Sequence, residues 1–108
     1  MFFVENNDIT ITKGDSGHFL VKLENGDGTE FVPSGSDVVR FSVKHKKEGY
    51  YPVILEKTGE KIVLDAKDTQ NVKSGEYVYD IAVEKATGER YTAVEGKFIV
   101  RKAVHEFE

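Results

Sequence analysis

Residues 75–83 read Gly75-Glu76-Tyr77-Val78-Tyr79-Asp80-Ile81-Ala82-Val83. Successive side chains of a β-strand point to opposite faces, so the aromatic and aliphatic residues at every second position from Tyr77 share one face. The other face carries small or charged residues. This alternation is typical of a strand with one buried face. We therefore expect residues 75–83 to form the central strand of an all-β domain.

Six further segments have the composition of short strands, and glycine-rich or polar turns separate them. They are residues 8–12, 18–23, 38–44, 53–56, 61–64 and 91–101. One short helical turn is expected near residues 66–71, with Asp65 as its capping residue. Residues 8–101 are thus predicted as the folded domain, residues 1–7 as an N-terminal arm and residues 102–108 as a C-terminal tail.

Tyr77 follows a turn-rich approach and stands near the start of a late strand. In immunoglobulin-like sandwiches a tyrosine at this place bonds through its hydroxyl to the backbone a few residues upstream. Tyr77 fits this structural corner, and the alternative is that Tyr77 and Tyr79 are ordinary core aromatics. Phe41 is the large aromatic residue that we expect in place of the tryptophan that such domains often carry.

About seven short strands with one helical turn predict an immunoglobulin-like antiparallel β-sandwich. A small antiparallel barrel is the alternative fold, and it requires the first and last strands to close on each other.

The composition excludes several classes of function. The chain has 108 residues and a formal net charge of -4, which argues against nucleic acid or an anionic membrane surface as the partner. It has no cysteine, so it has neither a disulfide nor a thiol nucleophile. No apolar run approaches the roughly 18 residues of a membrane-spanning helix. The first residues lack the basic region of a signal peptide, so none is expected.

The sequence contains no recognisable catalytic constellation. None of His18, His45 and His105 has a second ligand at a metal-like spacing. The serine residues lie in turns without the motif of a nucleophile elbow. Asp27 and Glu30 lack the spacing of a calcium loop, which favours a solvated turn. We expect no catalytic, metal-binding or cofactor-binding residue, no cofactor and no enzymatic activity.

Exposed aromatic residues point instead to binding. Tyr50 and Tyr51 follow a glycine at a strand edge, where tyrosine offers a large contact area at little entropic cost. This pair favours partner contact, or alternatively the stacking of a sugar on a carbohydrate- or cell-surface-binding module. Phe2 and Phe3 are expected to cover a sheet edge or to reach a neighbouring subunit.

The outer face of the expected sheet is the other candidate surface. Val78 and Ile99 lie on it among charged residues and form a modest apolar patch for a partner. Asp80 is placed to pair across strands with Arg40 or Lys97, although an exposed ion pair contributes only about 0.2–1 kcal/mol.

Three parts of the chain carry a family resemblance. They are residues 8–15 (DITITKGD), residues 39–44 (VRFSVK), and residues 65–69 (DAKDT) followed by residues 74–81 (SGEYVYDI) and 91–98 (YTAVEGKF). In this order they resemble small immunoglobulin-like domains of tailed bacteriophages and prophages, including those at the N-terminus of baseplate upper proteins. The resemblance spans nearly the whole domain.

The resemblance implies a non-catalytic structural or adaptor module of a virion or tail, made in the bacterial cytoplasm. It also implies that the partners are other phage structural proteins or copies of the same chain. No active-site residue is implied by this family.

Overall fold

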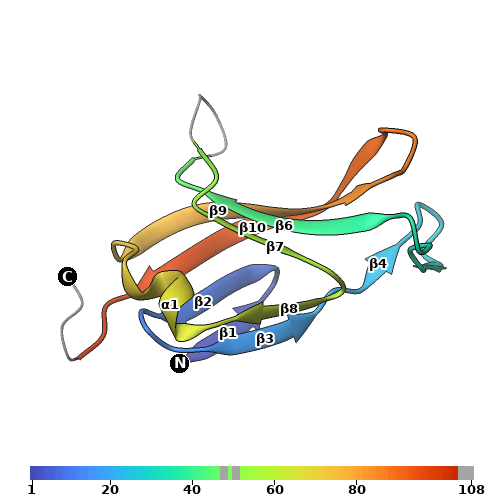
Figure 1. Ribbon diagram of the computed structural model, residues 1–108. Helices are drawn as coiled ribbons and strands as arrows, with labels where there is room; N and C mark the ends of the chain where they lie inside the picture. The colour runs from blue at the N-terminus through green and yellow to red at the C-terminus, as the bar shows by residue number, and fades with distance from the viewer. Residues whose placement is uncertain (47–48, 50–51, 105–108) are drawn as a thin grey trace.

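The computed structural model of this protein describes residues 1–46, 49 and 52–104. In this part of the chain, one short helix lies between the eighth and ninth of ten strands (Figure 1). The strands are β1 (Phe2–Glu5), β2 (Asp8–Thr12), β3 (Gly17–Leu20), β4 (Leu23–Glu24), β5 (Glu30–Phe31), β6 (Val38–Lys44), β7 (Leu55–Thr58), β8 (Lys61–Leu64), β9 (Gly75–Glu84) and β10 (Arg90–Arg101), and the helix is α1 (Ala66–Gln70). The all-β fold that the sequence predicts is confirmed.

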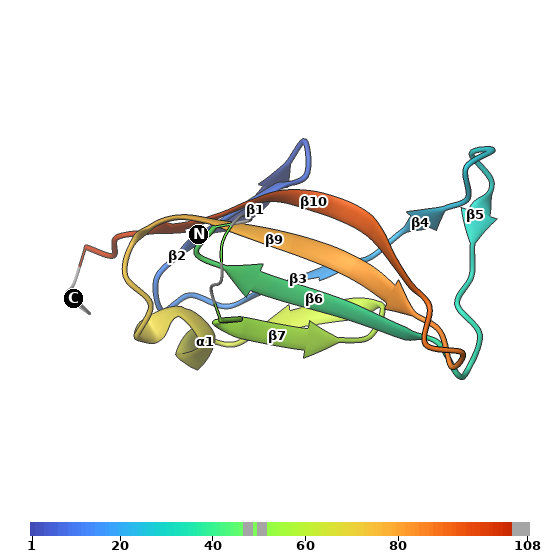
Figure 2. The ribbon, with the colours of Figure 1, turned by 90° about the horizontal axis from the view of Figure 1, so that it is seen from above.

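The larger sheet has six strands in the order β1-β2-β10-β9-β6-β7 (Figure 2). Neighbouring strands are antiparallel except for β2 and β10, which run parallel. The sheet is therefore mixed, whereas the sequence predicted purely antiparallel pairing. The predicted central strand, β9, pairs with β10 along its length and with β6 from Val78 to Glu84.

A second, smaller layer covers one face of this sheet. It consists of β3 and β8, which pair with each other in antiparallel fashion. Figure 1 shows this pair facing the upper strands β6, β9 and β10 across the core. Strands β4 and β5 form a third, two-stranded ribbon. Within the described residues β3 and β8 pair with no strand of the larger sheet, so the first and last strands meet in β2 and β10 without closing a hydrogen-bonded barrel.

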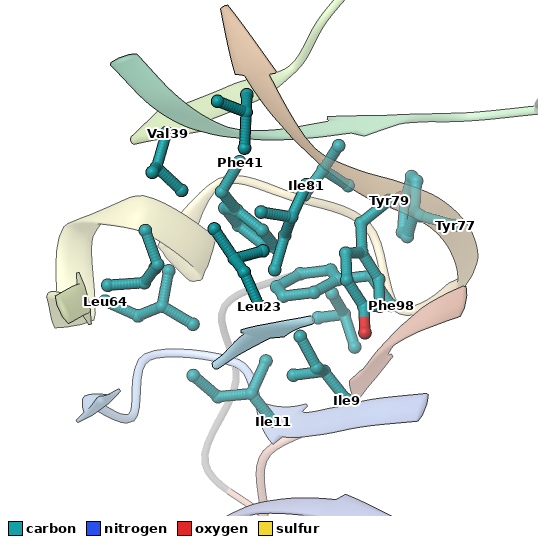
Figure 3. Close-up of a cluster of buried hydrophobic side chains, with 14 residues drawn as sticks. Ile9, Ile11, Leu23, Val39, Phe41, Leu64, Tyr77, Tyr79, Ile81 and Phe98 are labelled. Atoms are coloured by element: carbon teal, nitrogen blue, oxygen red, sulfur yellow. The ribbon is translucent and has the colours of Figure 1, made fainter. Parts of the chain in front are cut away.

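The core lies between the two layers and is aliphatic and aromatic (Figure 3). The apolar residues at every second position of β2, β6, β8 and β9 are buried there: Ile9, Ile11, Val39, Phe41, Val43, Ile62, Leu64, Tyr77, Tyr79, Ile81 and Val83. Phe41 is central, because its ring centroid lies 5.7 Å from that of Phe19, 5.4 Å from that of Tyr79 and 6.1 Å from that of Phe98. Phe41 thus occupies the central aromatic position that the sequence predicts.

The first residues of the chain do not form the predicted arm but the edge strand β1. Asn6 and Asn7 connect β1 to β2 and both have positive φ values, 50° and 69°. A two-residue hairpin turn with two positive φ values is of type I′, which matches the natural twist of the strands. Phe2 then stacks on Phe19, with ring centroids 6.2 Å apart. Both asparagines lie in the predicted arm, and they make the turn because asparagine is among the residues that tolerate this backbone conformation.

The helical turn matches its prediction closely. Helix α1 begins after Asp65, whose backbone N–H donates a hydrogen bond of 2.7 Å to the carboxylate of Asp68. The buried Thr69 accepts a hydrogen bond of 3.0 Å from the backbone N–H of Gly14. This bond connects the helix to the turn between β2 and β3, and no local pattern of residues predicts it.

Two expected strands have other boundaries in the structure, and a third contains an irregularity. The fourth expected strand, residues 53–56, lies at Leu55–Thr58 instead. The expected strand 18–23 is divided into β3 and β4. Strand β10 contains a bulge, because its register with β9 shifts between Thr92 and Val94.

The bulge changes the face on which Tyr91 lies. Tyr91 pairs with Val83, whose side chain is buried in the core. Strict alternation back from Ile99, which is predicted on the outer face, places Tyr91 on that face as well. The extra residue in the bulge reverses the alternation before Val94 and so places Tyr91 on the inner side.

Candidate interaction surfaces

Tyr77 forms the bond expected of a structural corner. Its hydroxyl donates a hydrogen bond of 2.6 Å to the backbone carbonyl of Lys73. Its ring is buried, and the ring centroid of His45 lies 5.0 Å away. The side chain therefore fixes the turn that leads into β9.

Tyr79 connects the same strand to the N-terminal hairpin. Its hydroxyl donates a hydrogen bond to the backbone carbonyl of Asn7. Burial, and secondarily the negative charge of Asp8, raise the pKa of Tyr79 above its ordinary value. A Cβ atom at Gly96 would lie 2.1 Å from the Asn7 carbonyl oxygen and 2.9 Å from the Tyr79 ring. Any side chain larger than that of glycine at position 96 would therefore disturb this hydrogen bond.

The outer face of the six-stranded sheet carries a shallow groove of about 350 Å³. Its lining includes Asp8, Lys44, Val78 and Lys97. The structure therefore places Val78, one of the predicted contact residues, in the wall of this groove. Ile99 is half-buried and lies outside the lining, so the two residues do not form one open apolar patch.

Arg40 is the centre of an ion-pair network on this face. Its guanidinium group donates two hydrogen bonds of 3.0 Å to the carboxylate of Glu84 and a further one to Glu56. The hydrogen bond from Arg40 holds the pKa of Glu84 below its ordinary value, and the two carboxylates together raise the pKa of Arg40. The network ties β6 to β7 and β9.

The predicted ion pair of Asp80 with Arg40 or Lys97 is wrong. The carboxylate of Asp80 lies 3.4 Å from the guanidinium of Arg90 instead. Lys97 lies 3.6 Å from Glu76. The charges of the outer face are largely matched within the protein, which leaves little net charge there to attract a partner.

The two N-terminal phenylalanines have different environments. Phe2 is half-buried against the core, and a Cβ atom at Gly17 would lie within 2.4 Å of its ring. Phe3 is 36% exposed, and the guanidinium carbon of Arg101 lies 5.8 Å from its ring centroid. Of the two predicted contact residues, Phe3 is the one available to a partner. The other predicted pair, Tyr50 and Tyr51, lies outside the described residues.

A second cavity, which we call the ribbon pocket, was not predicted from the sequence. It has a volume of about 260 Å³ and lies between the β4–β5 ribbon and the hairpin of β9 and β10. Its lining includes Leu23, Glu24, Phe31, Val83, Lys85 and Tyr91. The signal in the sequence was Tyr91 itself, but the bulge that turns it inward was not predictable from alternation.

Tyr91 is held in place at the mouth of the ribbon pocket. It is 53% exposed, and its hydroxyl donates a hydrogen bond of 2.5 Å to the carboxylate of Glu89. This bond raises the pKa of Tyr91 and lowers that of Glu89. Lys85 lies 4.9 Å from the ring centroid of Phe31 and 3.3 Å from the carboxylate of Asp37, so its charge is neutralised within the protein.

Groups with metal-binding potential are scattered. Within residues 1–46, 49 and 52–104, no cluster of three or more histidine, aspartate or glutamate side chains could hold a metal ion. His18 and His45 are exposed, and His105 lies outside the described part of the chain. Asp27 accepts hydrogen bonds of 3.0 and 2.6 Å from Thr29, which lower its pKa, as in an ordinary polar turn.

Among the described residues, no helix has the length and apolar character needed to cross a membrane. Comparison with known proteins does not assign the chain to a family. No family model matches the chain, and no curated protein matches it either.

Proposed function

We propose that this protein is a non-catalytic, immunoglobulin-like module that makes protein–protein contacts in a phage or prophage virion or tail assembly. The order of sequence motifs supports this proposal through its resemblance to such domains. The corner bond between Tyr77 and Lys73 and the two-layered β-structure agree with an immunoglobulin-like assignment.

The observation that carries the proposal is the apolar edge strand β1. It is the first strand in the order of the larger sheet and pairs only with β2 among the described residues. Phe3 and Val4 on this strand are 36% and 47% exposed. A sheet edge with exposed apolar side chains is a ready site for another chain to add to, unless charge or cover protects it. A subunit of an assembly provides that cover.

The test uses particles produced by a bacterial strain that carries the gene and its phage or prophage. After induction, particles are separated by density-gradient sedimentation, and the protein is detected with an antibody. The proposal predicts that the protein sediments with capsid or tail proteins. If the protein is found only in the soluble fraction at the top of the gradient, the proposal is wrong.

A pair of variants links the result to the edge strand. Val4→Lys places a charge on the edge of β1 and should reduce co-sedimentation strongly. Val63→Lys changes an equally exposed valine, 45% exposed, on β8 in the other layer and should leave co-sedimentation unchanged. Circular dichroism shows whether each variant is folded before the particles are examined.

A further inference from the structure

The ribbon pocket combines an apolar floor with one lining carboxylate, that of Glu24. Leu23 and Val83, which are both buried, line it together with the half-buried Phe31. Its volume of about 260 Å³ is below the range of about 300–1,000 Å³ that is usual for small-molecule sites. The cavity is therefore better matched to one inserted side chain than to a cofactor or a large ligand.

The β4–β5 ribbon beside the pocket carries a repulsive pair of charges, of which Glu24 lines the pocket and Glu30 does not. Glu24 of β4 and Glu30 of β5 stand directly opposite each other in the ribbon. Both are exposed, and neither carboxylate has an ion-pair partner among the described residues. Like charges at directly opposite positions of a β-pair destabilise it. A cationic group from outside would relieve this repulsion, whereas the nearby Lys85 is already engaged by Asp37.

The pocket also borders an unpaired stretch of sheet edge. Strand β2 pairs with β10 only over Phe98–Arg101, while β9 pairs with β10 from Arg90 onward. Among the described residues, no strand pairs with the first half of β10 on the side of β2. Figures 1 and 2 show the β4–β5 ribbon and the β9–β10 hairpin at the same end of the molecule. Unpaired backbone groups of an edge can bind an extended peptide.

We propose that the ribbon pocket is the docking site for an extended segment of a partner protein in which apolar and basic side chains alternate. Alternate side chains of such a segment point to opposite sides. One set enters the pocket over Leu23 and beside Tyr91, and the other lies near Glu24 and Glu30. This inference rests on the proposed function, because it describes a second contact surface of the same module. It shares no residue with the β1 edge.

The probe is a short synthetic peptide in which valine and lysine alternate, labelled for fluorescence anisotropy. The control peptides have the same residues grouped in two blocks, or glutamate in place of lysine. The inference predicts that only the alternating basic peptide binds the wild-type protein. Absence of binding, or equal binding of all three peptides, would overturn it.

Variants assign the binding to the pocket. The double variant Glu24→Gln, Glu30→Gln removes both carboxylate charges of the ribbon and the repulsion between them, so it should fold and bind the peptide about tenfold more weakly. Ala93→Trp, at an exposed position in the lining, should block the mouth and abolish binding. Glu60→Gln changes an exposed carboxylate in the turn before β8 and should bind like the wild type. Wild-type affinity in all three variants contradicts the inference.

Amide chemical shifts in NMR spectra provide a second measurement of where the peptide binds. The peptide should shift the resonances of Tyr91 and Phe31 and leave those of Lys44 and Val78 in the outer groove unchanged. Shifts at Tyr91 caused by a neutral oligosaccharide, with none caused by the peptide, would identify a sugar site and overturn the inference.

The sedimentation experiment tests the proposed function independently of the docking site. A protein that sediments with particles but ignores the peptide retains the proposed function and loses the docking site. A protein that binds the peptide at the pocket but stays free of particles retains the docking site and loses the phage assignment.

Discussion

The hydroxyl oxygen of Tyr77 lies 2.6 Å from the carbonyl oxygen of Lys73, four residues earlier in the chain. The bond closes the turn between α1 and β9, so it fixes the approach to the central strand. Because the side chain of Tyr77 is buried, water has little access to replace the bond when it is removed.

Replacing Tyr77 by phenylalanine should therefore lower the free energy of unfolding by about 1 kcal/mol, since the ring packing stays and one hydrogen bond is lost. Urea denaturation followed by circular dichroism measures this change. Tyr91→Phe removes an exposed hydroxyl and should change the free energy by less than about 0.5 kcal/mol. Equal effects of the two variants would contradict a special role for the corner.

Gly96→Ala should be destabilising by about 1–3 kcal/mol, because the new methyl group overlaps the Asn7 carbonyl and the Tyr79 ring. Gly35→Ala is the matched control, since a Cβ atom there meets nothing within 4 Å. Thermal denaturation of both variants provides the comparison. If Gly96→Ala melts at the wild-type temperature, the hairpin turn of β1 and β2 does not rest against β10 as described.

Glu84→Gln should make the free energy of unfolding depend less steeply on pH in the acidic range. The pKa of Glu84 is lowered in the folded state, so the unfolded state binds more protons as the pH falls. The stabilisation from this group is present above the ordinary value of 4.5 and is lost as the pH falls through the folded-state pKa. The wild-type melting temperature should fall more steeply than that of Glu84→Gln between about pH 5 and pH 3.

Arg40→Leu should flatten the same pH dependence, because it removes the group that lowers the pKa of Glu84. The double variant Arg40→Leu, Glu84→Gln should then have the same pH dependence of the melting temperature as either single variant. Identical pH profiles for the wild type and Glu84→Gln would mean that the ion pair does not persist in solution.

Phe41→Ala should lower the free energy of unfolding by about 3–5 kcal/mol, since it removes a ring that contacts three other aromatic residues in the core. Phe41→Leu leaves a smaller cavity and should be less harmful, which keeps the effect measurable if the alanine variant does not fold. Leu20→Ala removes a side chain that is 68% exposed and should have almost no effect. Chemical denaturation distinguishes the three.

Local alternation was sufficient to locate most of the core. The aromatic and aliphatic residues of β6, β8 and β9 recur at every second position and are buried where the alternation places them. None of these three strands carries an extra residue, because the bulge between β9 and β10 lies on β10, and so their own period of two is undisturbed. The same holds for the helical turn, whose start at Asp65 is a local property.

Features that depend on register between distant strands could not be predicted in this way. The bulge near Thr92 inverts the faces of Tyr91 and its neighbours, and thereby creates one wall of the ribbon pocket. The partner of Asp80 depends on the same register, which brings Arg90 within 3.4 Å. Side-chain alternation within one strand carries no information on these alignments.

The phage assignment, the absence of activity and the contact roles of Tyr50 and Tyr51 stay predictions. Of the other predicted contact residues, the structure distinguishes Phe3, which is open to a partner, from Phe2, which packs on Phe19. Sequence alone could not separate two adjacent phenylalanines, because the turn at Asn6 and Asn7 decides which of them faces the core.

The parallel pairing of β2 with β10 has a consequence for biosynthesis. Asp8 caps the backbone N–H of Lys97 across a separation of 89 residues, and Ile9 pairs with Phe98. Contacts this distant in the chain form slowly because a long loop must close first. During translation the hairpin of β1 and β2 therefore keeps its apolar face exposed until β10 has left the ribosome and can pair with β2.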